Sequence, residues 1–564
     1  MTWTQVFTPV GGNLGLSALV ALLPILYFFW ALAIKRMKGY IAGITTLLFA
    51  ILIAVLVYKM PTGMAVMSAM QGAVYGVMPI GWIIITSVFL YKLTVKTGQF
   101  DVIRNSVVSI TEDRRLQALL VAFSFGAFLE GAAGFGAPVA ISASLLVGLG
   151  FNPLYAAGLC LIANTAPVAF GAIGIPITAM EGPTGIAAME ISKMVGRQLP
   201  FLSAFIPLYL VFIMAGWKKT MEVLPAILVS GLSFAITQYL TSNFLGPELP
   251  DILSSLVSLV ALALFLRFWQ PKTIFRFADE PAFSEVAAAS QRQASNQVSY
   301  TGGQIFKAWS PFLVLTIFIS VWGIPSIKPA LVGKYTGGNF ILNIINSISK
   351  STTFYPNVPG LHNLIIGANG KPMAAQFKLE LLAAAGTAIL LAAIVTKFIV
   401  SISWKNWFVT FGETLNELKF PILTIGSVVG FAYVANASGM STTMGMLLAG
   451  TGALFPFFSP FLGWLGVFIT GSDTSSNLLF ANLQKVTATS VGMNPILALA
   501  ASSSGGVTGK MISPQSIAVA CAAVGLAGKE SDLFRFTIKH SLFLICIVGI
   551  ITFLQAHVLS WMIP

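Results

Sequence analysis

The sequence predicts an all-α polytopic membrane protein, with about 12 transmembrane helices and two re-entrant hairpins. Of the 564 residues, 56% are hydrophobic and only 9% are charged, whereas a soluble chain carries roughly 25% charged residues. The mean hydropathy is +0.87, and several stretches of about 20 apolar residues reach the length that crosses roughly 30 Å of hydrocarbon. These stretches do not alternate as the strands of a β-barrel would. The composition therefore excludes soluble enzymes, nucleic-acid-binding proteins and disordered chains.

Twelve apolar stretches are predicted to be spans. They lie at about 14–34, 39–57, 79–96, 153–180, 199–217, 220–241, 250–267, 306–327, 377–400, 420–437, 493–521 and 540–562. The residues before the first stretch lack the basic region of a signal peptide, so we expect this stretch to remain as a span. Cys160, Cys521 and Cys546 lie in apolar stretches and are expected to be small buried residues, not disulfide or metal ligands.

Two further segments, at about 116–150 and 458–484, are apolar but rich in Gly, Ala, Ser and Asn. Each is awkwardly long or interrupted for a simple span. We expect each to be a re-entrant hairpin that enters the membrane and leaves on the same side. Such backbone is tolerated only where it is buried in protein or lines a wet cavity.

Basic residues outnumber acidic ones, 31 to 18, which gives a net charge of +13. In a membrane protein, this excess is typical of cytoplasmic loops. Basic clusters follow the first, third, fifth and seventh spans, and they contain Lys35, Arg36, Lys38, Lys96, Arg104, Arg114, Arg115, Lys218, Lys219, Arg267, Lys272, Arg276 and Arg292. All of them fall on one side if both hairpins return. We therefore expect that side to be the cytoplasm, with both termini outside.

Landmarks of the first half recur in the second half at offsets of 338 to 342 residues. The matched positions are 78–79 with 420–421, 126–131 with 466–471, 152–153 with 494–495, and 175–176 with 513–514. On the expected topology the spans that begin at Pro79 and Pro421 run in opposite directions. This predicts inverted-topology repeats, which in secondary transporters place the binding site between the halves. The predicted division is 1–269, a cytosolic linker at 270–305, and 306–564.

Glu130 lies in the first hairpin and is the single acidic residue of 114–180. An ionisable side chain inside a membrane is costly and by default indicates function. Gly131, Gly134 and Gly136 follow it and can adopt positive φ and expose backbone amides, and the N-termini of half-helices in such a break suit a carboxylate. The same glycines could simply allow close helix packing, and a buried glutamate could be paired with a cation or hydroxyl.

Asp473 is the single acidic residue of the second hairpin and has hydroxyl and amide neighbours. Ser472, Ser475 and Asn477 are candidates to bind a substrate hydroxyl, a carboxylate or a water molecule. Residues of these types also readily satisfy the backbone of a polar hairpin tip.

Each hairpin is followed by a span that we expect to be interrupted, at 164–167 and at 502–510. Asn164, Thr165 and Gln515 are further candidates to bind substrate or line a cavity. Lys510 lies well inside its span, where an unpaired ammonium is costly. It is either a counter-ion for Glu130 or Asp473, or the cation that meets the substrate's carboxylate, or a lysine that snorkels to an interface.

Four stretches resemble the bacterial L-lactate permease family, and the similarity extends over nearly the whole chain. They are FLEGAAGFGAPVAI at 128–141, CLIANTAPVAFGAIGIPI at 160–177, TGSDTSSNLLFANLQ at 470–484 and SSSGGVTGKMISPQSIAVAC at 502–521. The resemblance implies symport of a proton with a 2-hydroxymonocarboxylate (L-lactate, and also D-lactate and glycolate) across the bacterial inner membrane. Within that frame, Glu130 or Asp473 would carry the proton, and Lys510 with the hairpin amides would bind the carboxylate.

Other function classes remain open from the residues alone. One is a secondary transporter of another small organic or inorganic anion, and another is an anion channel, which would conduct without proton coupling. A membrane enzyme is disfavoured because His362, His540 and His557 are isolated and no nucleophile–base pair or metal cluster is visible. No cofactor, metal or nucleic acid is expected. Substrate ranking, proton against sodium coupling, a homo-oligomeric state, and an elevator against a rocking motion also stay open.

Overall fold

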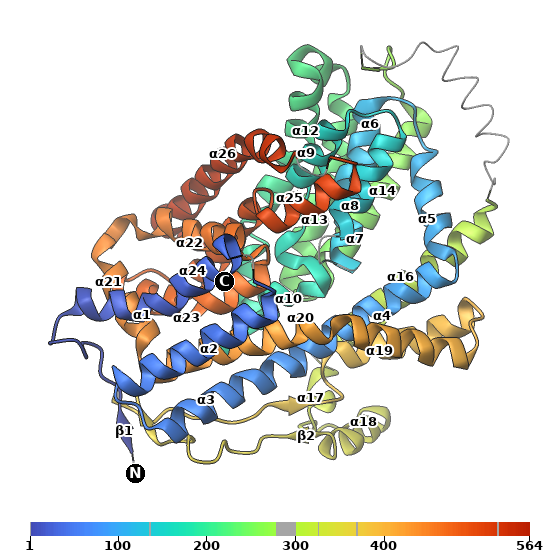
Figure 1. Cartoon of the computed structure of the whole chain (residues 1–564). Coiled ribbons are helices and arrows are strands. Elements are labelled where there is room, and N and C mark those ends of the chain that lie inside the picture. The colour runs from blue at the N-terminus through green and yellow to red at the C-terminus, as the bar shows by residue number, and fades with distance from the viewer. Residues whose placement is uncertain are drawn as a thin grey trace.

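The computed structural model describes residues 2–35, 37–132, 134, 137–277, 300–324, 326–367, 370–526 and 529–564. Helices make up almost all of the regular structure (Figure 1). Among the described residues, 11 helices are long and apolar enough to cross a membrane, or 12 if one bent pair counts as a single span. The prediction of an all-α polytopic membrane protein with about 12 spans is confirmed.

The chain begins with long apolar helices. They are α1 (Leu14–Phe29) with a π-helical extension at Trp30–Ile34, α2 (Gly39–Leu56), α3 (Thr62–Tyr75), α4 (Trp82–Lys96) and the shorter α5 (Gln99–Val108). α3 and α4 form one run of 35 residues, so the expected span 79–96 starts too late. Pro79 does not begin a helix here, because the non-helical backbone of Met78 accommodates it inside a longer one.

The first hairpin has the expected helix–break–helix form. Its arms are α6 (Arg114–Gln117), the π-helical segment Ala118–Phe125 and α7 (Gly126–Ala132) on one side, and α8 (Ala137–Gly148) on the other. α7 and α8 pack against each other. Re-entry of this hairpin from one side of the membrane stays a prediction.

A buried arginine holds the base of this hairpin. Arg115 is fully buried, although the sequence predicts it only as part of a cytoplasmic basic cluster. Its guanidinium lies 2.7 Å from Asp113 Oδ2 and 2.8 Å from Glu222 Oε2, and it also donates to the carbonyl of Thr273. Asp113 in turn accepts from the backbone N–H of Phe275. The network joins the base of the hairpin to the last residue of the helix Leu199–Glu222 and to the segment that follows the helix Pro250–Phe268.

The interruption expected at 164–167 is present. α9 (Pro153–Ala163) and the helical stretch Val168–Thr184, which contains α10 (Gly171–Thr184), are bent by 65° relative to each other. α11 (Ala188–Val195), α12 (Leu199–Glu222), α13 (Leu224–Phe244) and α14 (Pro250–Phe268) follow. Most of the expected linker 270–305, namely 278–299, lies outside the described residues.

The second half contains the second hairpin. Its helices are α16 (Gly302–Gly323), α17 (Lys328–Leu331), α18 (Phe340–Lys350), α19 (Ala385–Ile399), α20 (Trp404–Ser438), α21 (Met440–Leu448), α22 (Phe455–Thr470), α23 (Asp473–Val491), α24 (Pro495–Lys510), α25 (Pro514–Ala523) and α26 (Glu530–His557). α22 and α23 pack together as the arms of the hairpin.

The expectation of a break at 502–510 is wrong. This stretch is the helical second part of α24, and the break before α25 lies at 511–513. Its glycines permit close contact: a Cβ added at Gly505 would collide with the carbonyl of Pro460, and one at Gly509 with that of Trp464, both on α22. Glycine therefore serves helix packing here.

The region between the expected spans 306–327 and 377–400 lies along α3 (Figure 1), where Gln71 Nε2 donates to the carbonyl of Gln376. Besides α17 and α18 it contributes β2 (Thr353–Phe354), which pairs with β4 (Leu379–Glu380), and β3 (Ile365–Ile366), which pairs with the N-terminal β1 (Trp3–Thr4). Gln5 Nε2 also donates to the carbonyls of Asn436 and Ala437 at the end of α20.

The run α3–α4 and the 35-residue α20 lie side by side and antiparallel (Figure 1). Cβ atoms added at Gly72 and Gly76 would lie within 3 Å of the backbone at Gly430 and Gly426, so four glycines let the two helices approach closely. At the other end, Lys92 and Lys96 pair with Glu417 and Glu413.

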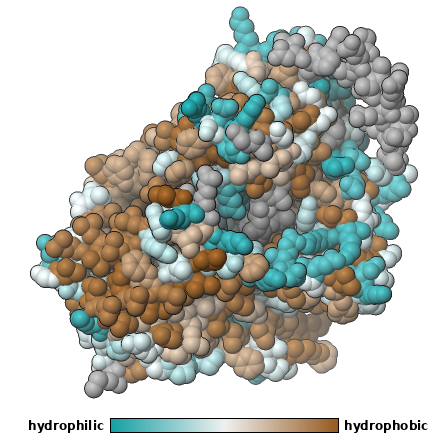
Figure 2. Space-filling view, in the orientation of Figure 1, coloured by the Kyte–Doolittle hydropathy of each residue, from teal (hydrophilic) through white to brown (hydrophobic). Residues whose placement is uncertain are grey.

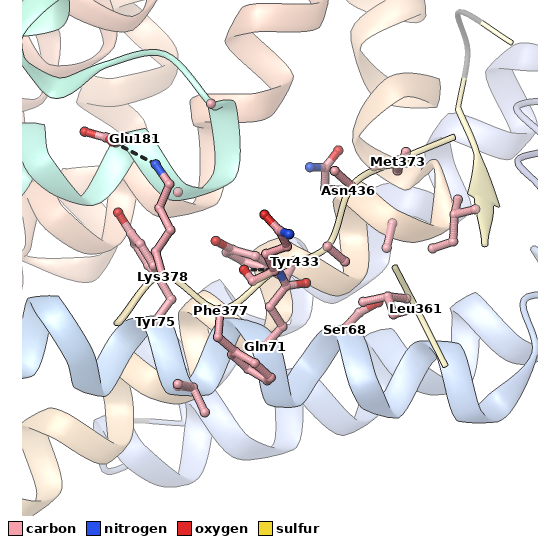
Figure 3. A pocket seen from close by; sticks show the side chains of 18 of the residues that line it. Ser68, Gln71, Tyr75, Glu181, Leu361, Met373, Phe377, Lys378, Tyr433 and Asn436 are labelled. Carbon is pink, nitrogen blue, oxygen red and sulfur yellow. Dashed lines mark hydrogen bonds and ion pairs between the residues drawn. The ribbon is translucent and has the colours of Figure 1, made fainter. Parts of the chain in front are cut away.

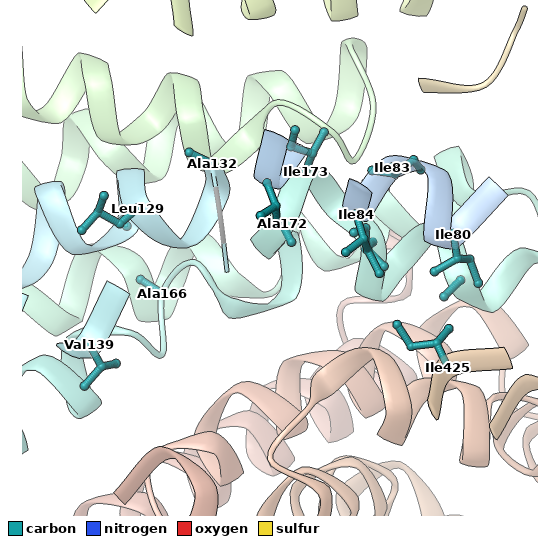
Figure 4. Packing of buried hydrophobic residues seen from close by; sticks show 14 of the residues in the cluster. Ile80, Ile83, Ile84, Leu129, Ala132, Val139, Ala166, Ala172, Ile173 and Ile425 are labelled. Carbon is teal, nitrogen blue, oxygen red and sulfur yellow. The ribbon is translucent and has the colours of Figure 1, made fainter. Parts of the chain in front are cut away.

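Apolar side chains cover much of the visible surface, most continuously over α1, α2 and α21, while hydrophilic ones gather near α4 and α5 (Figure 2). Inside, a buried apolar cluster surrounds the break of the first hairpin and includes Leu129, Ala132, Ala166, Ala172 and Ile173 (Figure 4). The polar groups of the hairpin are thus set in an apolar environment. Cys160 and Cys521 are buried as expected, but Cys546 is exposed on α26, so that part of the cysteine prediction is wrong.

Candidate functional site

The breaks of the two hairpins meet at a small cavity of about 90 Å³, which we call the hairpin cavity. It is lined by residues of the two breaks, of α7, α10, α23, α24 and α25, and by Val168. Six of the predicted site residues line it: Glu130, Gly134, Ser472, Asp473, Lys510 and Gln515. The fold therefore brings together six predicted residues that are spread between positions 130 and 515 of the sequence.

Glu130 and Lys510 form an ion pair in this cavity. Lys510 Nζ lies 2.6 Å from Glu130 Oε1, and the side chains are only 10% and 4% exposed. Asn164 Nδ2 donates to the other carboxylate oxygen at 3.1 Å. Of the alternatives for Lys510, the structure places it as the counter-ion of Glu130, too deeply buried to snorkel. A Cβ at Gly171 would lie 2.8 Å from Glu130 Oε1, so this glycine leaves room for the carboxylate.

Asp473 is the first residue of α23 and follows the N-cap Ser472, whose hydroxyl accepts from the backbone N–H of Ser475. Asp473 Oδ2 accepts from Ser503 Oγ at 2.7 Å and from Asn477 Nδ2 at 3.3 Å. Oδ1 has no hydrogen-bond donor among the described residues. One oxygen of this buried carboxylate therefore lacks a donor from the described part of the chain, and it faces Gly506 of α24, where an added Cβ would collide with it.

The other predicted residues that the structure describes do not line the hairpin cavity. Asn477 Nδ2 also donates to the carbonyl of Pro176 in α10, so it joins the second hairpin to the interrupted span of the first half. The Thr165 hydroxyl is buried without a described partner. Gly131 packs closely against Asp251. Gly136 lies outside the described residues.

The beginning of α10, beside the hairpin cavity, has a strained backbone. Ala172 and Ile173 have φ values of 45° and 59°, in the left-handed region, and Gly174 follows at 70°. A branched residue such as Ile173 is a clear outlier there, and such strain persists only where the surroundings enforce it, most often at functional sites.

Sequence reasoning missed two polar groups of the site. Ser503 was expected within a span interruption, not as a donor to Asp473. Asp251 falls at the start of the expected span 250–267 and is given no role there, yet it lies in the first turn of α14, 1% exposed, against the end of α7. The available signal is one acidic residue at the start of an apolar span, which is common at span ends and therefore weak.

A larger cavity of about 280 Å³ lies under the segment 361–378, and we call it the loop cavity (Figure 3). Tyr75 of α3 and Tyr433 of α20 line it, together with Glu181 near the end of α10 and Lys378, whose Nζ lies 3.5 Å from Glu181 Oε1. Because α10 begins at the hairpin cavity and ends at the loop cavity, one helix connects the two.

Comparison with known proteins gives a consistent result. Residues 17–559 match the family described as L-lactate permease. The L-lactate permease of Bacillus subtilis (strain 168) is 73% identical, the glycolate permease GlcA of Escherichia coli (strain K12) 56%, and the L-lactate permease of the same Escherichia coli strain 54%; each alignment covers 100% of both chains.

Proposed function

Because this chain belongs to the L-lactate permease family, we propose that it imports L-lactate by symport with a proton, and that it also accepts glycolate and D-lactate. The names of the relatives, L-lactate permease and glycolate permease, support the first and second of these substrates. The chain is a multi-pass bacterial membrane protein of a permease family. A secondary carrier is the function that buried, paired charges at a central cavity support best.

The observation that carries the proposal is the buried pair of Lys510 and Glu130. A substrate carboxylate that enters the hairpin cavity would compete with Glu130 for the ammonium of Lys510. Once Lys510 binds the substrate, Glu130 would be left as an unpaired buried carboxylate, which is strongly disfavoured. Uptake of a proton removes that charge. Binding of the substrate anion therefore favours binding of the proton, because the proton neutralises the carboxylate that the substrate leaves unpaired.

The remaining roles follow from position. Asp473, with one oxygen unpartnered among the described residues, is the second candidate for the proton. The break of the first hairpin borders the cavity at Gly134, whose amide donates to the carbonyl of Leu129, so help from the glycine amides in binding the carboxylate stays a prediction. The hydroxyl and amide side chains provide partners for the substrate hydroxyl, and they are Asn164, Thr165, Ser472, Ser475, Asn477 and Gln515.

The direct test is uptake of labelled L-lactate into liposomes that contain the purified protein. We expect an inward proton gradient to drive accumulation and an inward sodium gradient alone to have no effect. Stimulation by sodium and not by protons would overturn the coupling assignment. A flux that does not saturate and does not respond to the proton gradient would indicate a channel.

Single substitutions assign the proton within this assay. Glu130→Gln and Asp473→Asn remove each candidate carboxyl group with almost no change in volume. We expect at least one of them to abolish accumulation driven by the proton gradient while the protein remains folded. Normal proton-driven uptake by both variants would exclude both residues as proton carriers.

A further inference from the structure

Asp251 is a buried acidic residue that the roles above do not use. It is 1% exposed, and neither of its carboxyl oxygens has a hydrogen-bond partner among the described residues. The two other acids of the region differ: Glu130 has Lys510 and Asn164, and Asp473 has Ser503 and Asn477. Of the three carboxyl groups, Asp251 is therefore the one whose ionised form has least support.

Asp251 lies against Gly131, the residue that follows Glu130 in α7. A Cβ built on Gly131 would come within 2.7 Å of the Asp251 Cβ, so the first turn of α14 touches the end of α7 next to Glu130. The absence of a side chain at Gly131 is what permits this approach. It explains Gly131 through packing, beside the expected role of its amide.

Few charges face Asp251 from the elements packed against α14. α13 and the segment Ala118–Phe125 contain no charged residue, and the one acid of α10, Glu181, lies near its far end. The charges that act on Asp251 are the carboxylate of Glu130 and, in the opposite sense, the ammonium of Lys510. Lys510 is already bound to Glu130.

Two neighbouring carboxyl groups thus share one ammonium in apolar surroundings. The dipole of α14 favours a negative charge in its first turn, but this effect is small compared with the cost of an unpaired buried carboxylate. The neutral, protonated form of Asp251 is the one that fits its surroundings here.

We propose that Glu130 and Asp251 hold one proton between them, and that Asp251 carries this proton while Lys510 is bound to Glu130. The inference rests on the proposed proton symport and deepens it. When a substrate carboxylate takes over Lys510, the pair keeps its proton, and anion and proton cross together. After the substrate leaves on the cytoplasmic side, the O–H bond of Asp251 breaks and the proton passes to water that enters from that side. Lys510 returns to Glu130, and Asp251 takes up a proton again from water on the opposite side, which restores the substrate-free state.

The test compares two activities of the reconstituted full-length protein. Accumulation of labelled L-lactate on a proton gradient requires a proton to load and unload, whereas exchange of internal for external L-lactate at equal pH does not. Asp251→Asn mimics a permanently protonated Asp251. We expect this variant to lose accumulation and to retain exchange. Glu248→Gln, which removes a half-buried acid three residues earlier, is the matched control and should retain both.

Infrared spectroscopy supplies a readout that a structural role would not change. Substrate-free wild-type protein should show the carbonyl band of a protonated carboxyl group that is missing in Asp251→Asn. Should that variant not fold, Asp251→Glu takes its place, and the band should move to the position of a protonated glutamic acid.

The outcomes separate this inference from the proposed function. Normal proton-driven accumulation by Asp251→Asn, loss of exchange together with accumulation in a folded variant, or no band that depends on residue 251 would each overturn the inference. Failure of the wild-type protein to respond to the proton gradient would instead overturn the proton symport itself.

Discussion

Lys510 and Glu130 are 380 positions apart in the chain, yet Nζ and Oε1 lie 2.6 Å apart in a buried site. Removing one partner of a buried pair leaves the other charge uncompensated, which typically costs about 3–5 kcal/mol. We therefore expect Lys510→Met to lower the free energy of unfolding by about this amount. Protonation of Glu130 at low pH removes the unpaired charge, so we expect the decrease in stability to become larger as the pH rises. Thermal unfolding at several pH values measures it.

The double variant Lys510→Met with Glu130→Gln is the matched control. It removes both charges, so we expect stability to recover toward that of the wild-type protein while uptake of L-lactate stays lost. If the double variant transported normally, Lys510 would have no part in substrate binding.

For single residues, the sequence indicates which side chains belong to the site but not which of them pair with one another. Glu130, Asp473 and Lys510 could be predicted because charges are scarce in apolar stretches, and all three line the hairpin cavity. The pairing of Lys510 with Glu130 rather than Asp473 could not be predicted, because it depends on how α7 and α24 meet. Asp251 was missed because its burial is created by contact with α7, which nothing local encodes.

Among the described elements, α22 and α24 form a close contact. A Cβ at Gly505 would collide with the carbonyl of Pro460, and one at Gly463 with that of Ser502. Backbone atoms cannot rotate away as a side chain can. We expect Gly505→Ala to destabilise the protein by about 1–3 kcal/mol through overpacking, and to disturb Lys510, five residues further along α24. The thermal unfolding temperature and the L-lactate affinity measure the two effects.

Gly412→Ala is the control for that prediction. Gly412 lies in α20, and a Cβ added there would meet nothing within 4 Å. Alanine in an open helical position is expected to be neutral or to stabilise by roughly 0.5–1 kcal/mol. Equal effects of the two substitutions would show that the contact between α22 and α24 is not tight.

Helix α24 shows which kinds of element can be predicted from sequence and which cannot. The hairpins and the interruption at 164–167 were predicted from Gly, Pro and Asn inside apolar stretches. The glycine-rich stretch 502–510 has the same composition but is helical, because its glycines face a neighbouring helix. Composition alone cannot separate a break from a close contact. The span at 62–96 was predicted too short for a related reason, since Pro79 lies inside the helical run.

For the whole molecule, the strongest regularity is the pair of antiparallel 35-residue runs, Thr62–Lys96 and Trp404–Ser438. Their first residues are separated by 342 positions, as are Pro79 and Pro421, which matches the offset of the sequence landmarks. Asn152 and Asn494 also both cap the helix that follows. These features favour inverted-topology repeats, which stay a prediction, because the orientation of each half relative to a membrane is not defined by the fold alone.

Orientation can be tested with two single cysteines. Lys378 lines the loop cavity, in the region whose strand β3 pairs with the N-terminal β1. Lys219 belongs to the cluster around Arg115 at the base of the first hairpin, where its carbonyl accepts from the Arg115 guanidinium. The side chains of Lys378 and Lys219 are 60% and 45% exposed. Since basic clusters favour the cytoplasm, we expect Lys378→Cys to react with a membrane-impermeant thiol reagent in intact cells, and Lys219→Cys to react only after permeabilisation.

The experiment needs a background in which the exposed Cys546 is replaced, whereas Cys160 and Cys521 are buried. That background without an added cysteine is the control for residual labelling. Labelling of Lys219→Cys in intact cells, with Lys378→Cys protected, would reverse the predicted topology and place both termini in the cytoplasm. The expected pattern would place the loop cavity, which Lys378 lines, on the side from which L-lactate is imported.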